Sequence, residues 1–321
     1  MERIIAAEAL SKKFNDVQAV DQVTFDLFKG ELFGFLGPNG AGKTTTIKML
    51  TGLARPTDGT AWIDGVDISK EPKNAQRLMG VVPDESNLYP ELTGFENLVF
   101  CASLYGMHRE ERRIRARDLL DMFDLNAAAD RKFETYSKGM KRKLTIAAGI
   151  IHNPPLLFLD EPTTGIDVAS ARQIRTMISD LHNSGTTIFL TTHYIEEAER
   201  LCDRIAFIVD GRIIRNAPVS ELLQPIKNDH ILEISVLSGS EKAESSVAEK
   251  FPEYTVETRA GQTMRFRAKT TIAVAPLINH LEASGAEVLD ARRIVPSLED
   301  VFVQVTGLEK AEMENSRNGK G

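Results

Sequence analysis

A glycine-rich loop at residues 37–44 is the first feature of the sequence that could do chemistry. Its sequence, GPNGAGKT, matches the pattern G-x-x-x-x-G-K-[ST], follows the apolar run LFGFL and precedes a helical pattern, TTTIKMLTGL. Small residues in such a loop let successive backbone N–H groups surround a phosphate, and the start of the helix adds positive potential. A glycine turn that binds nothing is the alternative, but the strand and helix around the loop disfavour it. We predict a nucleotide-phosphate site with Lys43 on the phosphates and Thr44 as a Mg²⁺ ligand.

Two adjacent carboxylates end another apolar run, LLFLDEP. Asp160 can hold magnesium as the acidic residue that completes a phosphate-loop site, and Glu161 can orient or deprotonate the attacking water. Carboxylates at a strand end could also cap a loop. His193 follows the run TIFLTT, at what would be the carboxyl end of a strand, where open α/β sheets bind ligands. A histidine there can equally be structural.

The stretch YSKGMKRKL combines a tight turn with the start of a basic helix. Ser137, Gly139 and the free amides at the helix start could form a second anion site, since a hydroxyl, main-chain N–H groups and the helix dipole all favour negative charge. An ordinary serine cap followed by a solvated basic face is the alternative, and the residues alone leave both open. Because the phosphate loop of this chain already accounts for one triphosphate, a second anion site would have to bind a different anion or another nucleotide.

These residues require a mostly parallel sheet covered by helices. The strand candidates are near-continuous apolar runs, which are typical of strands buried on both faces: LFGFLG, LLFLDEP, TIFLTTH and RIAFIVDG. From Phe95 to Phe123 apolar residues recur at helical spacing, so we expect a helical subdomain at about residues 90–150. The sequence therefore predicts an α/β domain over residues 1–221.

The pattern changes after Pro225. A strand, a polar helix, two paired strands, a second helix and a final strand follow in the order of a ferredoxin-like α+β domain, and the segment VPSLEDVFVQVTG supplies a closing helix. We place this smaller domain at residues 229–307. Residues 308–321 contain too few large apolar side chains to bury, which predicts a disordered tail.

Composition excludes several classes of protein. A net charge of −7 disfavours a protein that coats nucleic acid, because such binding needs clustered Lys and Arg. Two cysteines, Cys101 and Cys202, lie far apart without metal-type spacing, which suits a reduced intracellular compartment. The longest uncharged run, LTIAAGIIHNPPLLFL, is shorter than the ~20 residues of a membrane-spanning helix. We expect no transmembrane segment.

Together these motifs resemble the ATP-binding subunit of an ABC transporter. GPNGAGKTT resembles the family's Walker A motif, LLFLDEP its Walker B motif with the catalytic glutamate, and TTGID its D-loop. TTH resembles the switch-histidine segment, and YSKGMKRKL the signature motif, usually written LSGGQ. The domain ending in PSLEDVF is similar to an accessory domain of some ABC exporter subunits. The resemblance implies a P-loop NTPase fold of the ABC ATPase type over residues 1–221.

The resemblance also implies how nucleotide binds. Two such domains stack head to tail, so Ser137 and Gly139 would contact the γ-phosphate of ATP held by the opposite subunit, and Phe14 would stack on adenine, with core filling as its alternative role. Glu161 and His193 would be catalytic. ATP and Mg²⁺ are the implied cofactors, and the nucleotide loop comprises Gly37, Pro38, Asn39, Gly40, Ala41, Gly42, Lys43, Thr44 and Thr45.

The sequence departs from the family pattern in two places. The signature motif has Ser-Lys-Gly where Ser-Gly-Gly is commonest, a change that is tolerable because the lysine can face outward. In GVVPDESNLYPELT, Asp84 occupies the position of the family's Q-loop glutamine. A carboxylate there can ligate Mg²⁺, as we predict for Asp84 beside Thr44 and Asp160, but it also repels the γ-phosphate.

The favoured hypothesis is an ATPase subunit that closes as a homodimer on two ATP and drives export by separate transmembrane permease subunits. It would lie peripherally on the cytoplasmic face of the cell membrane and bind no nucleic acid. A rival hypothesis is an ABC-type ATPase acting on nucleic acid or the ribosome. Such relatives typically carry two cassettes or a long coiled-coil insert, and the acidic charge also disfavours this class. An unrelated P-loop kinase is a third option, but it would not need the YSKGM turn.

Overall fold

The computed structural model describes residues 2–224, 230–237, 246–247, 249–259, 263–294 and 297–307. The described residues form two compact units, one built on the chain up to Val219 together with residues from Phe302, and one from Ser220 to Val301. The predicted tail at 308–321 lies outside the described residues, as does part of the polar helix expected near residues 240–251.

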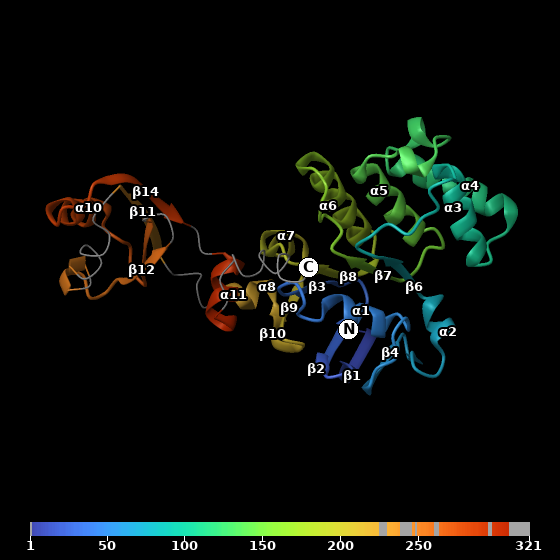
Figure 1. Cartoon of the computed structure of the whole chain (residues 1–321), viewed down its shortest axis with the longest axis horizontal. Helices are drawn as coiled ribbons and strands as arrows, with labels where there is room; N and C mark the ends of the chain where they lie inside the picture. Colours follow the sequence, from blue (N-terminus) through green and yellow to red (C-terminus); the bar gives the residue numbers. More distant parts are fainter. Residues whose placement is uncertain are drawn as a thin grey trace. The chain divides into compact units, whose positions relative to one another are not determined.

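A six-stranded, mostly parallel sheet forms the centre of the first unit (Figure 1). Its strands, in spatial order, are β10 (Arg212–Pro218), β9 (Arg204–Val209), β3 (Leu32–Leu36), β8 (Thr187–Thr192), β7 (Leu156–Asp160) and β6 (Met79–Val82). The four predicted runs form β3, β7, β8 and β9, and every residue of β3, β7 and β8 is buried. Because these strands are parallel, their carboxyl ends meet at one edge of the sheet.

A second, antiparallel sheet was not predicted. It consists of β2 (Val17–Phe28), β1 (Arg3–Phe14), β4 (Asp58–Ile63) and β5 (Val66–Asp67). Phe25 of β2 stacks on Phe33 of β3 with ring centroids 5.4 Å apart, and Phe189 of β8 joins the same aromatic cluster. This apolar core packs the second sheet against the central one and thereby supports the loop that follows β3.

Helices cover the central sheet and extend beyond it. Figure 1 shows α5 and α6 on one side of the central sheet and the antiparallel sheet on the other. The helices of the first unit are α1 (Lys43–Leu50), α2 (Pro72–Gln76), α3 (Gly94–Leu104), α4 (Arg109–Met122), α5 (Lys138–Gly149), α6 (Val168–Asn183) and α7 (Ile195–Leu201), followed by α8 (Val219–Leu223) at its boundary. α3, α4 and α5 pack together, so the predicted helical subdomain is present.

The second unit has ferredoxin-like strand order. Its sheet runs β12 (Thr255–Arg259), β13 (Thr263–Ala268), β11 (His230–Val236) and β14 (Val288–Ile294), with all neighbours antiparallel. α10 (Val274–Ala283) packs on one face through Leu277 and Leu281, which join its hydrophobic core. The predicted closing helix, α11 (Leu298–Thr306), is divided between the units: the second unit ends at Val301, and residues from Phe302 belong to the first. In neither unit does a described helix have the length and apolar character that crossing a membrane requires.

Candidate nucleotide site

The phosphate loop connects β3 to α1, as its sequence predicts. Gly42 caps α1 in the left-handed region, at φ 103°, where glycine has no steric cost. A Cβ at Gly37 would lie 2.1 Å from the carbonyl oxygen of Ile208 on β9, so only glycine fits there. These two glycines allow the loop to turn tightly over the end of the sheet.

Lys43 is buried at the first position of α1, with only 5% of its surface exposed. Its Nζ donates to the carbonyl oxygens of Gly37 at 2.7 Å and Pro38 at 3.1 Å, and it lies 3.3 Å from Oε1 of Glu161. Burial lowers the pKa of Lys43, although Glu161 and the more distant Asp160 oppose this effect. The ammonium group is therefore held inside the loop where phosphate would bind.

A cavity of about 300 Å³ opens above the loop. Its walls are Ala19, Asn39, Gly40, Gly42, Lys43, Thr44, Thr45, Asp84 and Glu161. The structure thus brings the nucleotide loop, the predicted water-activating carboxylate and Asp84 to one cavity, although they come from three separate segments of the chain.

Glu161 lies between two basic side chains. Its Oε2 is 3.0 Å from Nδ1 of His193 and accepts a hydrogen bond from Thr164 Oγ1 at 3.0 Å, while Oε1 faces Lys43. Burial alone would raise the pKa of Glu161, but the hydrogen bond from His193 and the charge of Lys43 together lower it to about 2. Glu161 also has φ 46°, a strained backbone conformation for this residue type that often marks functional sites.

Asp160 is almost fully buried at the end of β7. Thr191 of β8 donates from Oγ1 to Asp160 Oδ1 at 2.5 Å. Thr191 Oγ1 also accepts a hydrogen bond from the backbone N–H of Glu161 at 3.1 Å. Thr191 therefore fixes both carboxylate residues. It was missed as a site residue, although the TTH segment that contains it drew attention to His193.

The donor set suits a magnesium ion that is shared with phosphates. No three His, Cys, Asp or Glu side chains within the described ranges group as a metal site. Mg²⁺ in phosphate-loop sites needs few protein ligands, because phosphates and water fill the other positions. The Thr44 hydroxyl, Asp160 and Asp84 are hard oxygen donors of the required kind. Thr44 and Asp84 line the cavity, whereas Asp160 at the end of β7 is not part of its wall.

Ser137 and Gly139 lie at the start of α5 and are not part of the cavity wall. Ser137 Oγ accepts from the backbone N–H of Met140 at 3.2 Å, so it does cap the helix, while its hydroxyl proton stays available for a further acceptor. A Cβ at Gly139 would lie 2.3 Å from Oγ of Ser170 on α6. Packing against α6 is thus one reason for glycine at this position.

Phe14 ends β1 and is 49% exposed, with Nζ of Lys12 at 4.9 Å from its ring centroid. It does not border the 300 Å³ cavity. Its exposure is inconsistent with a core-filling role, and Lys12 covers one face of the ring.

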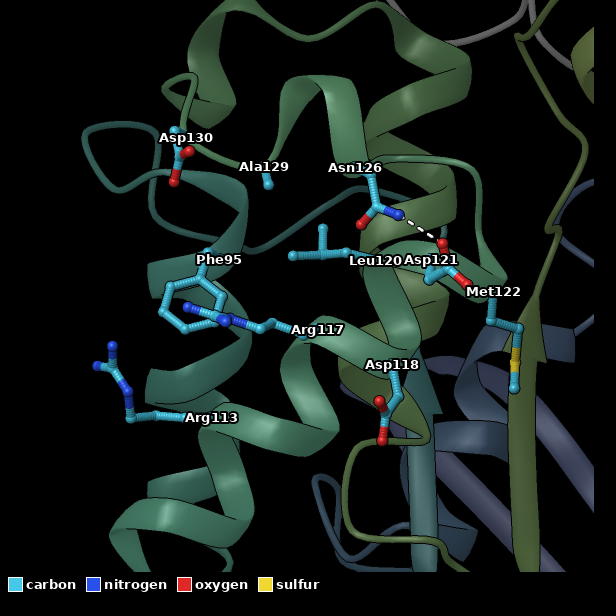
Figure 2. A pocket seen from close by; sticks show the side chains of 10 residues that line it. All are labelled: Phe95, Arg113, Arg117, Asp118, Leu120, Asp121, Met122, Asn126, Ala129 and Asp130. Atoms are coloured by element: carbon cyan, nitrogen blue, oxygen red, sulfur yellow. Dashed lines mark hydrogen bonds between the residues drawn. The ribbon is translucent and has the colours of Figure 1, made fainter.

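Another cavity, of about 780 Å³, lies in the helical subdomain and has a different character (Figure 2). Arg113 and Arg117 of α4 lie over the ring of Phe95, and Asp118 and Asp121 line the same hollow. It contains no part of the phosphate loop. The 300 Å³ cavity is therefore the candidate nucleotide site, because it contains the phosphate loop and the larger cavity does not.

A phosphate loop between a parallel strand and a helix, with an Asp-Glu pair at the carboxyl end of another strand of the same sheet, defines a P-loop nucleotide-binding protein. A family model described as "ABC transporter" matches residues 20–164. The chain is 37% identical over 307 residues to the linearmycin resistance ATP-binding protein LnrL of Bacillus subtilis (strain 168), covering 95% of this chain and 98% of that protein. It is 36% identical over 301 residues to the Nod factor export ATP-binding protein I of Burkholderia orbicola (strain AU 1054), covering 94% and 96% respectively.

Solved structures give the same result. The dimeric post-hydrolysis state of the ATP-binding cassette MJ0796 bound to ADP and Pi matches with a TM-score of 0.62 and 29% identity, over 67% of this chain and 98% of that chain. The chain belongs to the ABC transporter family, as an ATP-binding subunit that hydrolyses ATP. The rival nucleic-acid hypothesis gains no support from these relatives.

Proposed function

We propose that two copies of this chain close head to tail around two ATP molecules, and that closure and reopening drive export by separate transmembrane subunits. The observation that carries the proposal is the cavity over the phosphate loop, where Lys43 and Glu161 face each other at 3.3 Å. The named functions of the relatives, resistance and export, favour the direction. Which cargo is carried depends on the membrane subunits.

Each predicted residue has a role in this proposal. Lys43 and the loop of residues 37–45, through its free backbone N–H groups, bind the phosphates, and Phe14 stacks on adenine. Glu161 orients or deprotonates the attacking water, while His193 holds its carboxylate. Ser137 and Gly139 contact the γ-phosphate bound by the other copy. Thr44, Asp160 and Asp84 would hold Mg²⁺, which supplies charge neutralisation for the phosphates.

A groove of about 600 Å³ on the first unit is the docking surface that we assign to a transmembrane subunit. It is lined by Leu53 and Leu104, which are 67% and 70% exposed, by Tyr105, and by the basic side chains of Lys73 and Arg77. An apolar segment with acidic flanks would fit this surface. Its partner would therefore be a cytoplasmic segment of the permease, and the chain would lie peripherally on that face of the membrane.

The groove connects to the nucleotide site through packed groups. The ring of Tyr105 stacks on His152 with centroids 3.5 Å apart, and His152 Nε2 donates to the carbonyl oxygen of Met79 at 3.2 Å. Met79 begins β6, and β6 leads to Asp84 at the cavity. A partner that displaces Tyr105 would therefore disturb the strand that presents Asp84.

The domain limits also belong to the proposal. We assign ATP binding to residues 1–221, with the helical subdomain at about 90–150, and an accessory role to residues 229–307.

Mixing two inactive variants tests the shared site. Lys43→Ala removes the phosphate-loop cation and Ser137→Arg blocks the signature turn, so a mixed dimer contains one complete site. If dimers exchange freely and the sites act independently, hydrolysis should recover to about a quarter of the wild-type rate. Lys43→Ala mixed with the double variant Lys43→Ala/Ser137→Arg is the control, because no complete site can form. Recovery no greater than in this control, with mixed dimers demonstrated by crosslinking, contradicts the model.

A further inference from the structure

Arg142 is a buried cation that the functional assignment leaves unused. It lies in α5, five residues after Ser137, and only 5% of its surface is exposed. Burial lowers the pKa of its guanidinium, although the charges of Asp84 and Asp160 oppose this effect. Burying an arginine is costly unless its donors are satisfied, so its contacts require a reason.

The guanidinium donates to four main-chain carbonyl oxygens. Nε donates to Pro162 at 2.9 Å, and Nη2 donates to Asp160 at 2.6 Å. Nη1 donates to Asp84 at 3.0 Å and also to Pro83. Asp160 and Pro162 flank Glu161 at the end of β7, whereas Pro83 and Asp84 directly follow β6. One side chain thus ties the carboxyl ends of two neighbouring parallel strands together.

Both tied segments carry groups that border the nucleotide cavity. Asp84 forms part of its wall, and so does Glu161, whose backbone at φ 46° is held between the two carbonyl groups that Arg142 binds. A strained backbone persists only where its surroundings over-determine it. Displacing a catalytic group by about 1 Å can cost roughly 10²-fold in rate. The position of Arg142 therefore bears on hydrolysis more than on nucleotide affinity, which depends on the phosphate loop.

The geometry requires an arginine. A planar guanidinium presents five donors in a rigid fork, so it can reach carbonyl groups on two strands at once. A lysine carries three donors on a single nitrogen and cannot bridge the same four oxygens. Lys143, the next residue of α5, is buried to a similar extent, at 8% exposure, and takes no part in this cluster.

We propose that Arg142 is a positioning residue for ATP hydrolysis, which fixes Asp84 and Glu161 relative to each other by binding the main chain of both segments. This inference rests on the roles proposed above for those two residues, Asp84 as a Mg²⁺ ligand and Glu161 as the group that acts on the attacking water. Since Arg142 and Ser137 belong to one helix, a shift of α5 would move both strand ends with it.

The test compares Arg142→Lys and Arg142→Ala with Lys143→Ala as the matched control. ATP hydrolysis is measured over a range of ATP concentrations, and binding of a fluorescent ATP analogue and thermal unfolding are measured on the same preparations. We expect kcat of both Arg142 variants to fall about 10- to 100-fold with KM within roughly 3-fold of wild type. Lys143→Ala should keep its kcat within about 2-fold. Addition of guanidinium at tens of millimolar should restore part of the kcat of Arg142→Ala, because the small cation can occupy the vacated position.

Three results overturn the inference: kcat unchanged in Arg142→Lys, a loss of kcat matched by an equal loss of nucleotide binding, or a failure of guanidinium to restore folded Arg142→Ala. Glu161→Gln is assayed in parallel. If that variant hydrolyses ATP like wild type, the assigned site itself is wrong, whereas an inactive Glu161→Gln beside a fully active Arg142→Lys refutes only the role of Arg142.

Discussion

Replacing Glu161 with glutamine should destabilise the nucleotide-free protein while it abolishes turnover. The carboxylate interacts with Lys43, His193 and Thr164, and its pKa is about 2 against an ordinary value of 4.5. A depressed carboxylate pKa means that the ionised form is favoured in the folded state, so the stabilisation is present above about pH 4.5 and is lost as the pH falls towards 2. Each pKa unit corresponds to about 1.4 kcal/mol, which gives about 3 kcal/mol at neutral pH.

This value is an upper bound, because the burial that lowers the pKa of Lys43 destabilises the charged lysine and offsets part of the stabilisation of Glu161. For a domain of this size about 3 kcal/mol lowers Tm by roughly 6–12 °C. The assay is thermal unfolding without nucleotide at pH 7 and again near pH 3.5, where the difference between variant and wild type should shrink. Glu196→Gln is the control, because Glu196 is exposed on α7 and its replacement removes the same charge without removing a buried ion pair.

ATP should then raise the Tm of Glu161→Gln more than that of wild type, because Lys43 no longer has to leave a carboxylate to meet phosphate. Turnover should fall by about 10² or more, as expected for loss of a general base. Equal stability of variant and wild type at pH 7, together with an equal shift on adding ATP, would refute the proposed charge pairing. Unchanged turnover would remove Glu161 from the chemistry.

Two further predictions use other parts of the molecule. Burial lowers the pKa of His152 to about 4 from 6.5, so the folded state favours the neutral imidazole. The free energy of unfolding should therefore be highest above pH 6.5 and fall by up to about 3 kcal/mol as the pH is lowered towards 4. In denaturant unfolding at several pH values, His152→Phe should flatten this loss. An identical pH profile would contradict the burial argument. Phe14→Ala should weaken ATP binding by about 1–3 kcal/mol, the usual value of base stacking, whereas Phe14→Trp should retain it; equal affinity in isothermal titration would remove Phe14 from the site.

The central sheet could be predicted from sequence because its strands are buried on both faces. LFGFL and LLFLD are apolar throughout, so neither helical nor alternating patterns compete with that interpretation. The antiparallel sheet was not predicted, because two of its strands lack a regular pattern of side chains. β1 and β2 contain register shifts, and Ala9 and Gln22 adopt positive φ within them, which breaks the alternation that identifies a half-buried strand.

The site divides in a similar way. Residues 37–45 and Asp160–Glu161 were predictable because their chemistry lies in side chains at fixed spacing along short segments. Arg142 was not, although it lies in a stretch that attracted attention for another reason. Its partners are main-chain carbonyl groups between 18 and 59 residues away, and carbonyl groups leave no signature in residue type.

The charge balance of the cavity gives a physical reason for expecting magnesium. Lys43 faces carboxylates from Glu161, Asp160 and Asp84, so the nucleotide-free site already has more negative than positive groups around the loop. A triphosphate adds further negative charge, and in a partly buried site like charges a few ångströms apart repel strongly. The carboxylate of Asp84, which forms part of the cavity wall, adds to this repulsion. A divalent cation bound with ATP would convert these carboxylates from a barrier into ligands, so we expect ATP hydrolysis by this chain to depend on Mg²⁺.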